Sequence, residues 1–227
     1  AKIFENSPAL SYKVNDDHVK VLTKDGSIKA DRVVLACNGY LGNLEKSLTS
    51  KILPMNNYIV ATEILDDQTV KKINPKDIAF ADSRFVINYF RLSADKRLLF
   101  GGGENYSQEL SSNIIPIVTR PLEKIYPFLK GIKIDYAWGG KLAITMNRLP
   151  FFTSLHKDKV ISAQGYSGQG VALASYSGKL VSEKITGNGE TFDIMAKIPR
   201  QSFPGGRFLR NPSMKLGMLY YSLMDRL

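Results

Sequence analysis

The chain has 227 residues, 44% of them apolar, which is enough for a core in one large domain or two small ones. A single cysteine excludes a disulfide framework and favours a reducing compartment such as the cytoplasm, and with only two histidines no structural zinc site is expected. The net charge of +10 is scattered along the chain, and no apolar run reaches the roughly 18 residues of a membrane span, so we expect neither nucleic acid nor a membrane as partner.

Residues 19–36 contain the first expected elements. An alternating strand is predicted before the Asp25-Gly26 turn and a short return strand after it. Residues 33–36 form a continuous apolar run, which is typical of a fully buried parallel strand. This strand ends in a small-residue turn, after which a short helix is expected through Leu48.

The middle of the chain is predicted to hold strands and one helix. Strands are expected over residues 52–65, 84–92, 97–102 and 132–142. Apolar residues at steps of three and four predict a helix over residues 113–129. Pro121 lies inside that helix and is expected to kink or split it, because proline lacks the amide hydrogen that the helix uses.

The glycine-rich segment that follows is the most informative part of the chain. A buried apolar run at residues 160–163 enters a loop that contains Gly165, Gly168 and Gly170, and a small-residue helix begins there. Glycines let a backbone approach a flat ligand closely, and a helix start offers unpaired amides and a positive dipole end. The combination suits the edge of a reduced flavin ring, although many α/β proteins have such a loop for packing alone.

The helix after this loop is expected to approach a sheet or a ligand closely through one face. The residues on that face of the helix are Val171, Ala174, Gly178, Val181 and Ile185. Residues 190–227 form a basic extension punctuated by proline and glycine. Its apolar end, residues 214–227, is expected to be helical and to pack on the body rather than on a membrane.

Three segments carry a family resemblance. Residues 30–39 follow an A-x-x-V-V-x-A-x-G/N strand end, residues 138–150 contain W-x-G…T…P, and residues 165–170 read G-x-S-G-x-G. In this order they resemble the D-amino-acid oxidase/sarcosine oxidase superfamily of FAD-dependent oxidoreductases. Its γ-glutamylputrescine oxidoreductase subgroup is similar over residues 89–93, 99–104, 135–140, 144–150, 164–174 and 203–206, so the resemblance covers essentially the whole chain.

The resemblance implies an α+β or α/β fold: the C-terminal part of a two-domain FAD oxidoreductase, with a remnant of a Rossmann-like FAD-binding domain and an antiparallel-sheet substrate domain. It assigns residues 1–48 to the FAD-binding domain, 49–141 to the substrate-binding domain, 142–190 to a return to the FAD-binding domain and 191–227 to an extension. The family's G-x-G-x-x-G loop, which holds the FAD pyrophosphate, does not occur in this sequence. We therefore expect a fragment that lacks its N-terminal FAD-binding segment, holds FAD poorly and is inactive alone.

The implied reaction is FAD-dependent oxidation of the C–N bond of an amine such as γ-glutamylputrescine to an imine or aldehyde, with molecular oxygen reoxidising the flavin and giving hydrogen peroxide. Catalytic roles are implied for the backbone amides of Gly168, Gln169 and Gly170, which would stabilise the reduced ring, and for Trp138. Contacts to FAD are implied for Cys37, Asn38, Gly39, Gly140, Arg148, Gly165, Tyr166, Ser167, Gly168, Gln169, Gly170 and Val171. Contacts to the substrate are implied for Tyr89, Arg91 and Tyr166, and no metal is expected.

Several of these residues have a plainer interpretation. Tyr89 and Arg91 share one face of a strand and could equally be a surface pair. Trp138 could fill a core rather than line the flavin site. Cys37 could be a small packed residue, although some relatives attach flavin through cysteine.

Two positions bear on the substrate. Leu142 and Ala172 stand where the α-amino-acid branch of the family has an arginine and a lysine. The resemblance therefore implies an amine whose carboxylate is remote or absent. The alternatives are an oxidase or dehydrogenase of N-methyl or cyclic amino acids, and a non-catalytic binding or assembly module.

Overall fold

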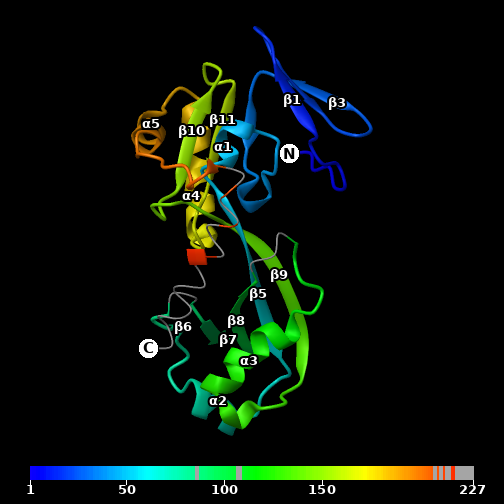
Figure 1. Cartoon of the computed structure of the whole chain (residues 1–227), viewed down its shortest axis with the longest axis vertical. Helices are drawn as coiled ribbons and strands as arrows, with labels where there is room; N and C mark the ends of the chain where they lie inside the picture. Colours follow the sequence, from blue (N-terminus) through cyan, green and yellow to red (C-terminus); the bar gives the residue numbers. More distant parts are fainter. Residues whose placement is uncertain (85–86, 106–108, 207–208, 210–211, 213–215, 218–227) are drawn as a thin grey trace. The chain divides into compact units, whose positions relative to one another are not determined.

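The computed structural model describes residues 1–227 except 85–86, 106–108, 207–208, 210–211, 213–215 and 218–227 (Figure 1). The chain divides into two compact units. Unit 1 comprises Ala1–Pro54 and Leu142–Arg210, and unit 2 comprises Met55–Lys141 and Asn211–Leu227. The helix expected over residues 214–227 lies almost entirely outside the described residues.

Unit 1 begins with a three-stranded antiparallel sheet. Its strands are β1 (Ser11–Val14), β2 (Val19–Leu22) and β3 (Ser27–Ala30). The turn at Asp25-Gly26 joins β2 to β3, and the Thr23 N–H closes it by donating to Gly26 O at 2.9 Å. The pairing of Val19 with Ala30 confirms the predicted hairpin. β1, for which the pattern gave no expectation, pairs with β2.

The second sheet of unit 1 joins segments that are far apart in the sequence. Its order is β10 (Phe151–Leu155), β11 (Val160–Gln164) and β4 (Val33–Leu35). β4 runs parallel to β11 with Val33 beside Val160, which confirms the predicted parallel strand. The expectation of full burial is wrong, because Leu35 is 2% exposed but Val34 is 41% exposed. Among the described residues, β4 is an edge strand of which only one face packs on a core.

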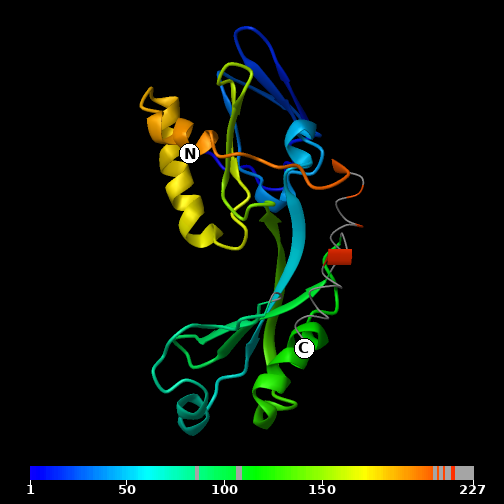
Figure 2. The ribbon, with the colours of Figure 1, turned by 60° about the vertical axis from the view of Figure 1, so that its left-hand side comes forward.

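Helices cover the second sheet of unit 1. Two short turns, η1 (Asn38–Tyr40) and α1 (Lys46–Thr49), follow β4 where one short helix was expected. α4 (Gly170–Ile185) follows β11 and runs alongside the sheet (Figure 2), and α5 (Glu190–Ala196) packs against both α4 and β10. Their shared core consists of Phe152, Ile161, Ala163, Leu180, Val181 and Phe192.

The packing face expected for α4 is only partly right. Val181 is buried as predicted, but Val171 is 98% exposed, and Ala174 and Gly178 are also exposed. The face that meets the sheet is centred on Ser177, Leu180 and Val181 instead. The first turn of α4 is therefore left uncovered by the described residues.

Unit 2 is built on a five-stranded sheet in the order β6-β7-β8-β5-β9. Its strands are β6 (Phe80–Ala81), β7 (Tyr89–Leu92), β8 (Leu98–Asn105), β5 (Leu53–Thr62) and β9 (Ile134–Ile144). The predicted pair of strands before and after residues 93–96 is confirmed, with Tyr89 opposite Gly101. The first of the two is shorter than expected and begins at Tyr89.

The helical segments α2 (Asp67–Ile73), α3 (Ile115–Ile125) and η2 (Pro127–Leu129) belong to unit 2. α3 is continuous through Pro121, so the proline does not split it. The fully buried Val118 and Leu122 hold the helix on the sheet across that position. α3 ends before Pro127, which disfavours helical backbone in the preceding residue. None of the helices in the described ranges has the length and apolarity that a bilayer crossing requires.

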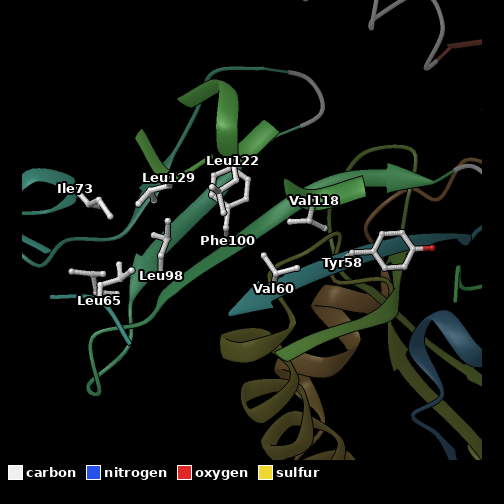
Figure 3. Packing of buried hydrophobic residues seen from close by; sticks show 10 residues of the cluster. Tyr58, Val60, Leu65, Ile73, Leu98, Phe100, Val118, Leu122 and Leu129 are labelled. Atoms are coloured by element: carbon white, nitrogen blue, oxygen red, sulfur yellow. The ribbon is translucent and has the colours of Figure 1, made fainter. Parts of the chain in front are cut away.

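The core of unit 2 occupies one face of its sheet. Tyr58 and Val60 from β5 and Leu98 and Phe100 from β8 meet α3 there (Figure 3). Burial of each such side chain contributes about 1.5–3 kcal/mol. Because side chains alternate along a strand, the intervening residues point to the opposite face. That opposite face carries two of the candidate substrate residues, Tyr89 and Arg91.

Candidate functional site

The glycine loop of unit 1 adopts backbone conformations that depend on its glycines. Gly165 has φ +75° and Gly168 has φ +93°, a region that other residues rarely adopt. A Cβ on Gly165 would also lie 2.7 Å from Thr145 Cγ2, so glycine is needed there for space. At Gly168 the surroundings are open, and only the backbone conformation requires glycine.

Hydrogen bonds tie this loop to two distant segments. The Gly165 N–H donates to Asn38 Oδ1 at 3.2 Å, which connects the loop to the turn after β4. The Ser167 N–H donates to Ala143 O at 2.9 Å, and the Thr145 N–H donates to Ser167 Oγ at 3.3 Å. The structure thus brings Asn38, a predicted contact residue, to the loop. It adds Thr145, the threonine of the W-x-G…T…P motif, which was not among the predicted contact residues.

Some backbone amides of the loop are engaged and others are not. The Gln169 N–H donates to Tyr166 O at 2.9 Å, so it is not available to a ligand in this conformation, contrary to the prediction. Within the described residues, no acceptor is recorded for the N–H groups of Gly168, Gly170 or Val171. These three amides remain as candidate donors at the start of α4.

Tyr166 does not present its side chain as the sequence predicted. It is 8% exposed, and its hydroxyl donates to Ala163 O at 2.9 Å. The ring packs inside unit 1 and the hydroxyl already has an acceptor. A direct substrate contact by Tyr166 is therefore not available in this arrangement.

The remaining predicted residues of unit 1 lie on two turns. Cys37 and Gly39 border Asn38; burial raises the pKa of the Cys37 thiol, which disfavours the thiolate needed for covalent attachment. Arg148 is exposed and has φ +61° in the turn between β9 and β10. That turn is joined to the loop through Thr145, whose hydroxyl donates to Leu149 O at 2.8 Å.

Unit 2 brings three predicted residues together. Tyr89, Arg91 and Trp138 line one hollow of ≈ 220 Å³ on the sheet face opposite α3. Its other lining residues are mainly apolar: Ile59, Ala79, Phe80, Phe90, Leu99 and Gly101. Trp138 is 44% exposed, which excludes the alternative that it fills a core within the described residues. Gly140 lies in β9 of the same unit.

Tyr89 is held in place by two residues that the sequence did not reveal. Its ring lies against Gly101, where an added Cβ would be 2.1 Å from Tyr89 Cε2. Because Gly101 has no side chain, Tyr89 reaches across β8 and its hydroxyl donates to Asn57 Oδ1 on β5. Gly101 belongs to the Gly-Gly-Gly run at residues 101–103, which is visible in the sequence. The position of Asn57 depends on a bulge between Asn56 and Tyr58, and the hydrophobic pattern of the sequence does not indicate that bulge.

Arg91 is the cation of this hollow. Its Nε donates to the neighbouring Leu92 O at 3.2 Å, and no carboxylate is among the described residues that line the hollow. Arg97, by contrast, donates to Asp95 at 2.8 Å and to Asp135 at 2.5 Å. Arg91 is therefore a candidate to meet an anionic group of a ligand, whereas Arg97 is committed to an internal ion-pair network.

A family model described as FAD dependent oxidoreductase (DAO) matches residues 1–184. The chain belongs to this family. It is 39% identical over 226 residues to a probable oxidoreductase OrdL of Rhizobium meliloti (strain 1021), a match that covers 100% of this chain and 52% of the relative. It is 39% identical over 208 residues to the gamma-glutamylputrescine oxidoreductase of Escherichia coli (strain K12), a match that covers 91% of this chain and 49% of that relative.

Solved structures show the same fold. L-proline dehydrogenase from P. horikoshii matches with a TM-score of 0.64 at 23% identity, over 82% of this chain and 50% of that one. The predicted family and α+β fold are thereby confirmed. The chain spans about half the length of the curated relatives it matches.

FAD is the cofactor of this family, and the glycine loop fits it. A Cβ on Gly168 would have no heavy atom within 4 Å, so the backbone is open to a ligand there. The amides of Gly168, Gly170 and Val171 stand at the positive end of the 16-residue helix α4. These donors suit the polar edge of a flavin ring that gains negative charge on reduction.

Proposed function

We propose that this chain carries part of an FAD-dependent oxidoreductase that oxidises the C–N bond of an amine, with oxygen as electron acceptor and hydrogen peroxide as product. The observation that carries the proposal is the glycine loop, with its left-handed Gly168 and, at the start of α4, amides for which the described residues supply no acceptor. FAD, when bound, supplies the hydride acceptor for this chemistry.

In unit 1 the chain's own contribution is electrostatic. The amides of Gly168, Gly170 and Val171 would hold the flavin edge and stabilise its negative charge. Loss of one such donor typically costs about 2.7–4 kcal/mol of barrier. Asn38 and Thr145 would keep the loop in its donating shape through their hydrogen bonds to Gly165 and around Ser167.

In unit 2 the hollow would bind the substrate. Its apolar wall of Ile59, Leu99 and Trp138 would exclude water from an uncharged amine, and Tyr89 would orient it. Arg91 would bind a carboxylate at the far end of the molecule. Leu142 and Ala172 supply no cation beside an α-carboxylate, which supports an amine whose carboxylate is remote.

We infer a γ-glutamylputrescine-like amine as the substrate class. A relative with 39% identity bears that activity in its name, and Arg91 in a hollow whose described lining is otherwise mainly apolar is consistent with a remote carboxylate. The FAD-binding role of unit 1 and the substrate-binding role of unit 2 belong to this same proposal.

The test is an anaerobic visible spectrum of the intact natural protein that carries this chain, recorded before and after γ-glutamylputrescine is added. Bleaching of the flavin band supports the cofactor, the reaction and the substrate class together. A flavin band that stays oxidised with this amine but bleaches with sarcosine or proline favours the N-methyl or cyclic amino acid alternative. A colourless protein that takes up no FAD contradicts the proposal and favours a binding module.

A further inference from the structure

Gln164, the last residue of β11, has an unusual environment. The residue is fully buried, yet neither Nε2 nor Oε1 of its carboxamide has a hydrogen-bond partner. Among the described residues, no other buried side-chain nitrogen or oxygen is in this state. A carboxamide offers two donor hydrogens and two acceptor lone pairs, so burial without partners destabilises the protein.

Two polar side chains close to Gln164 in the structure, those of Ser162 and Asn38, do have hydrogen-bond partners. Ser162 lies two residues earlier on the same face of β11, and its hydroxyl donates to Leu35 O at 3.2 Å. Asn38 accepts from the Gly165 N–H, immediately after Gln164. The missing partners are thus specific to Gln164, and a buried orphan group of this kind calls for an explanation in terms of a ligand, a water or a function.

The segment that follows Gln164 contains the second set of polar groups without partners. Gly165, Ser167 and Gly168 all have positive φ, and within the described residues the amides of Gly168 and Gly170 have no recorded acceptor. A buried side chain with unmet donors and acceptors therefore immediately precedes, in the chain, a loop with unmet donors. One rearrangement of the loop backbone could satisfy both sets, once a ligand accepts from the amides.

We propose that Gln164 is a positioning residue for the flavin. When the cofactor takes up the amides of Gly168, Gly170 and Val171, the carboxamide of Gln164 hydrogen-bonds the backbone of the 165–170 loop and holds it in the donating arrangement. Gln164 acts through the loop and does not touch the reacting atoms. The inference rests on the proposed function, because it requires flavin at the loop.

The test uses Gln164→Met in the intact natural protein that carries this chain. Methionine keeps the length of the side chain and removes the orphan polar atoms. We expect the FAD-free variant to melt at the same or a higher temperature than the FAD-free wild type. We expect its Kd for FAD to rise about tenfold, the loss of one net hydrogen bond in the bound state, with a smaller thermal shift on FAD addition and an altered visible flavin spectrum.

Ser162→Ala is the matched control. It removes a buried polar group from the same face of the same strand, but one that already has its partner in Leu35, so it should lower the melting temperature equally with and without FAD. The inference is overturned if Gln164→Met binds FAD like the wild type and gains the same thermal shift.

A second variant covers the case in which Gln164→Met does not fold. Gln164→Asn keeps the carboxamide but withdraws it by one methylene, and we expect weaker FAD binding; wild-type affinity in this variant also overturns the inference. A wild-type protein that takes up no FAD is a separate result, seen before any variant is made, and it contradicts the proposed function itself.

Discussion

The two candidate regions are built from different chemical groups. In unit 1 the glycine loop exposes backbone groups. Gly168 and Gly170 have no side chains, and the hydroxyl of Tyr166 already donates an internal hydrogen bond to Ala163 O. In unit 2 the hollow presents side chains, Tyr89 and Arg91 among them, on a sheet whose backbone is paired. Backbone donors serve a cofactor common to a family, whereas side chains can change to suit the substrate.

This difference predicts two kinds of mutational effect. Substitutions in the glycine loop should act through backbone conformation and alter FAD binding. Substitutions in the hollow should act through side-chain position or charge and alter substrate binding alone. The variants below separate the two, beginning with the largest expected effect.

Gly168→Ala should have the largest effect, on FAD binding. With φ +93°, an alanine there would be strained by about 1–3 kcal/mol, which corresponds to about 5- to 150-fold weaker binding if the loop must keep its shape. The measurement is the Kd for FAD from quenching of flavin fluorescence.

Gly178→Ala is the control for this loop variant. Gly178 lies inside α4, and an added Cβ would meet no heavy atom within 4 Å. Alanine there should stabilise the helix by about 0.5–1 kcal/mol and leave FAD affinity unchanged. Equal FAD affinity of Gly168→Ala and Gly178→Ala would refute a backbone-built cofactor site.

Gly101→Ala should have the next largest effect, on the substrate. The new Cβ would occupy the place of the Tyr89 ring, 2.1 Å from Cε2, and would push the hydroxyl away from Asn57. Overpacking of about 1–3 kcal/mol predicts a KM roughly tenfold higher, with unchanged FAD affinity. Steady-state kinetics checks this, with Gly26→Ala as a control because its Cβ would meet no heavy atom within 4 Å.

Arg91→Met should have a smaller effect that depends on the substrate. Arg91 is exposed, so its pairing with a carboxylate is worth about 0.2–1 kcal/mol, a KM increase of up to about fivefold for γ-glutamylputrescine. The KM for putrescine, which has no carboxylate, should not change. An equal increase for both amines would show that Arg91 shapes the hollow rather than binding the acid.

Asp135→Asn should have the smallest effect, and it should change neither FAD binding nor substrate binding. The hydrogen bond from Arg97, followed by that from Lys133, lowers the pKa of the Asp135 carboxyl. A carboxyl whose pKa is lower in the folded state stabilises the fold above its unfolded pKa, and this contribution is lost as the pH falls through the folded pKa. Urea unfolding should therefore separate wild type from variant at neutral pH but not in acid below the pKa of the folded carboxyl. A difference that persists there would contradict the ion-pair assignment.

Local patterns in the sequence were enough to predict several secondary-structure elements and the family of this protein. The Asp25-Gly26 hairpin, the parallel strand at Val33 and the order of the glycine loop and α4 follow from alternation, turn residues and glycine conformations. The family follows from motifs whose spacing is visible without a structure. Each depends on residues that are neighbours in the chain, which is why a linear pattern carries it.

Only the tertiary structure decided which distant groups meet. Asn38 bonds Gly165 across 127 residues, and Tyr89 reaches Asn57 because a bulge and an empty position at Gly101 allow it. The exposure of Val171 and the unmet carboxamide of Gln164 likewise depend on what packs around them. Hydrogen-bond partners and burial are set by contacts between strands and helices remote in sequence, and periodicity alone does not specify those contacts.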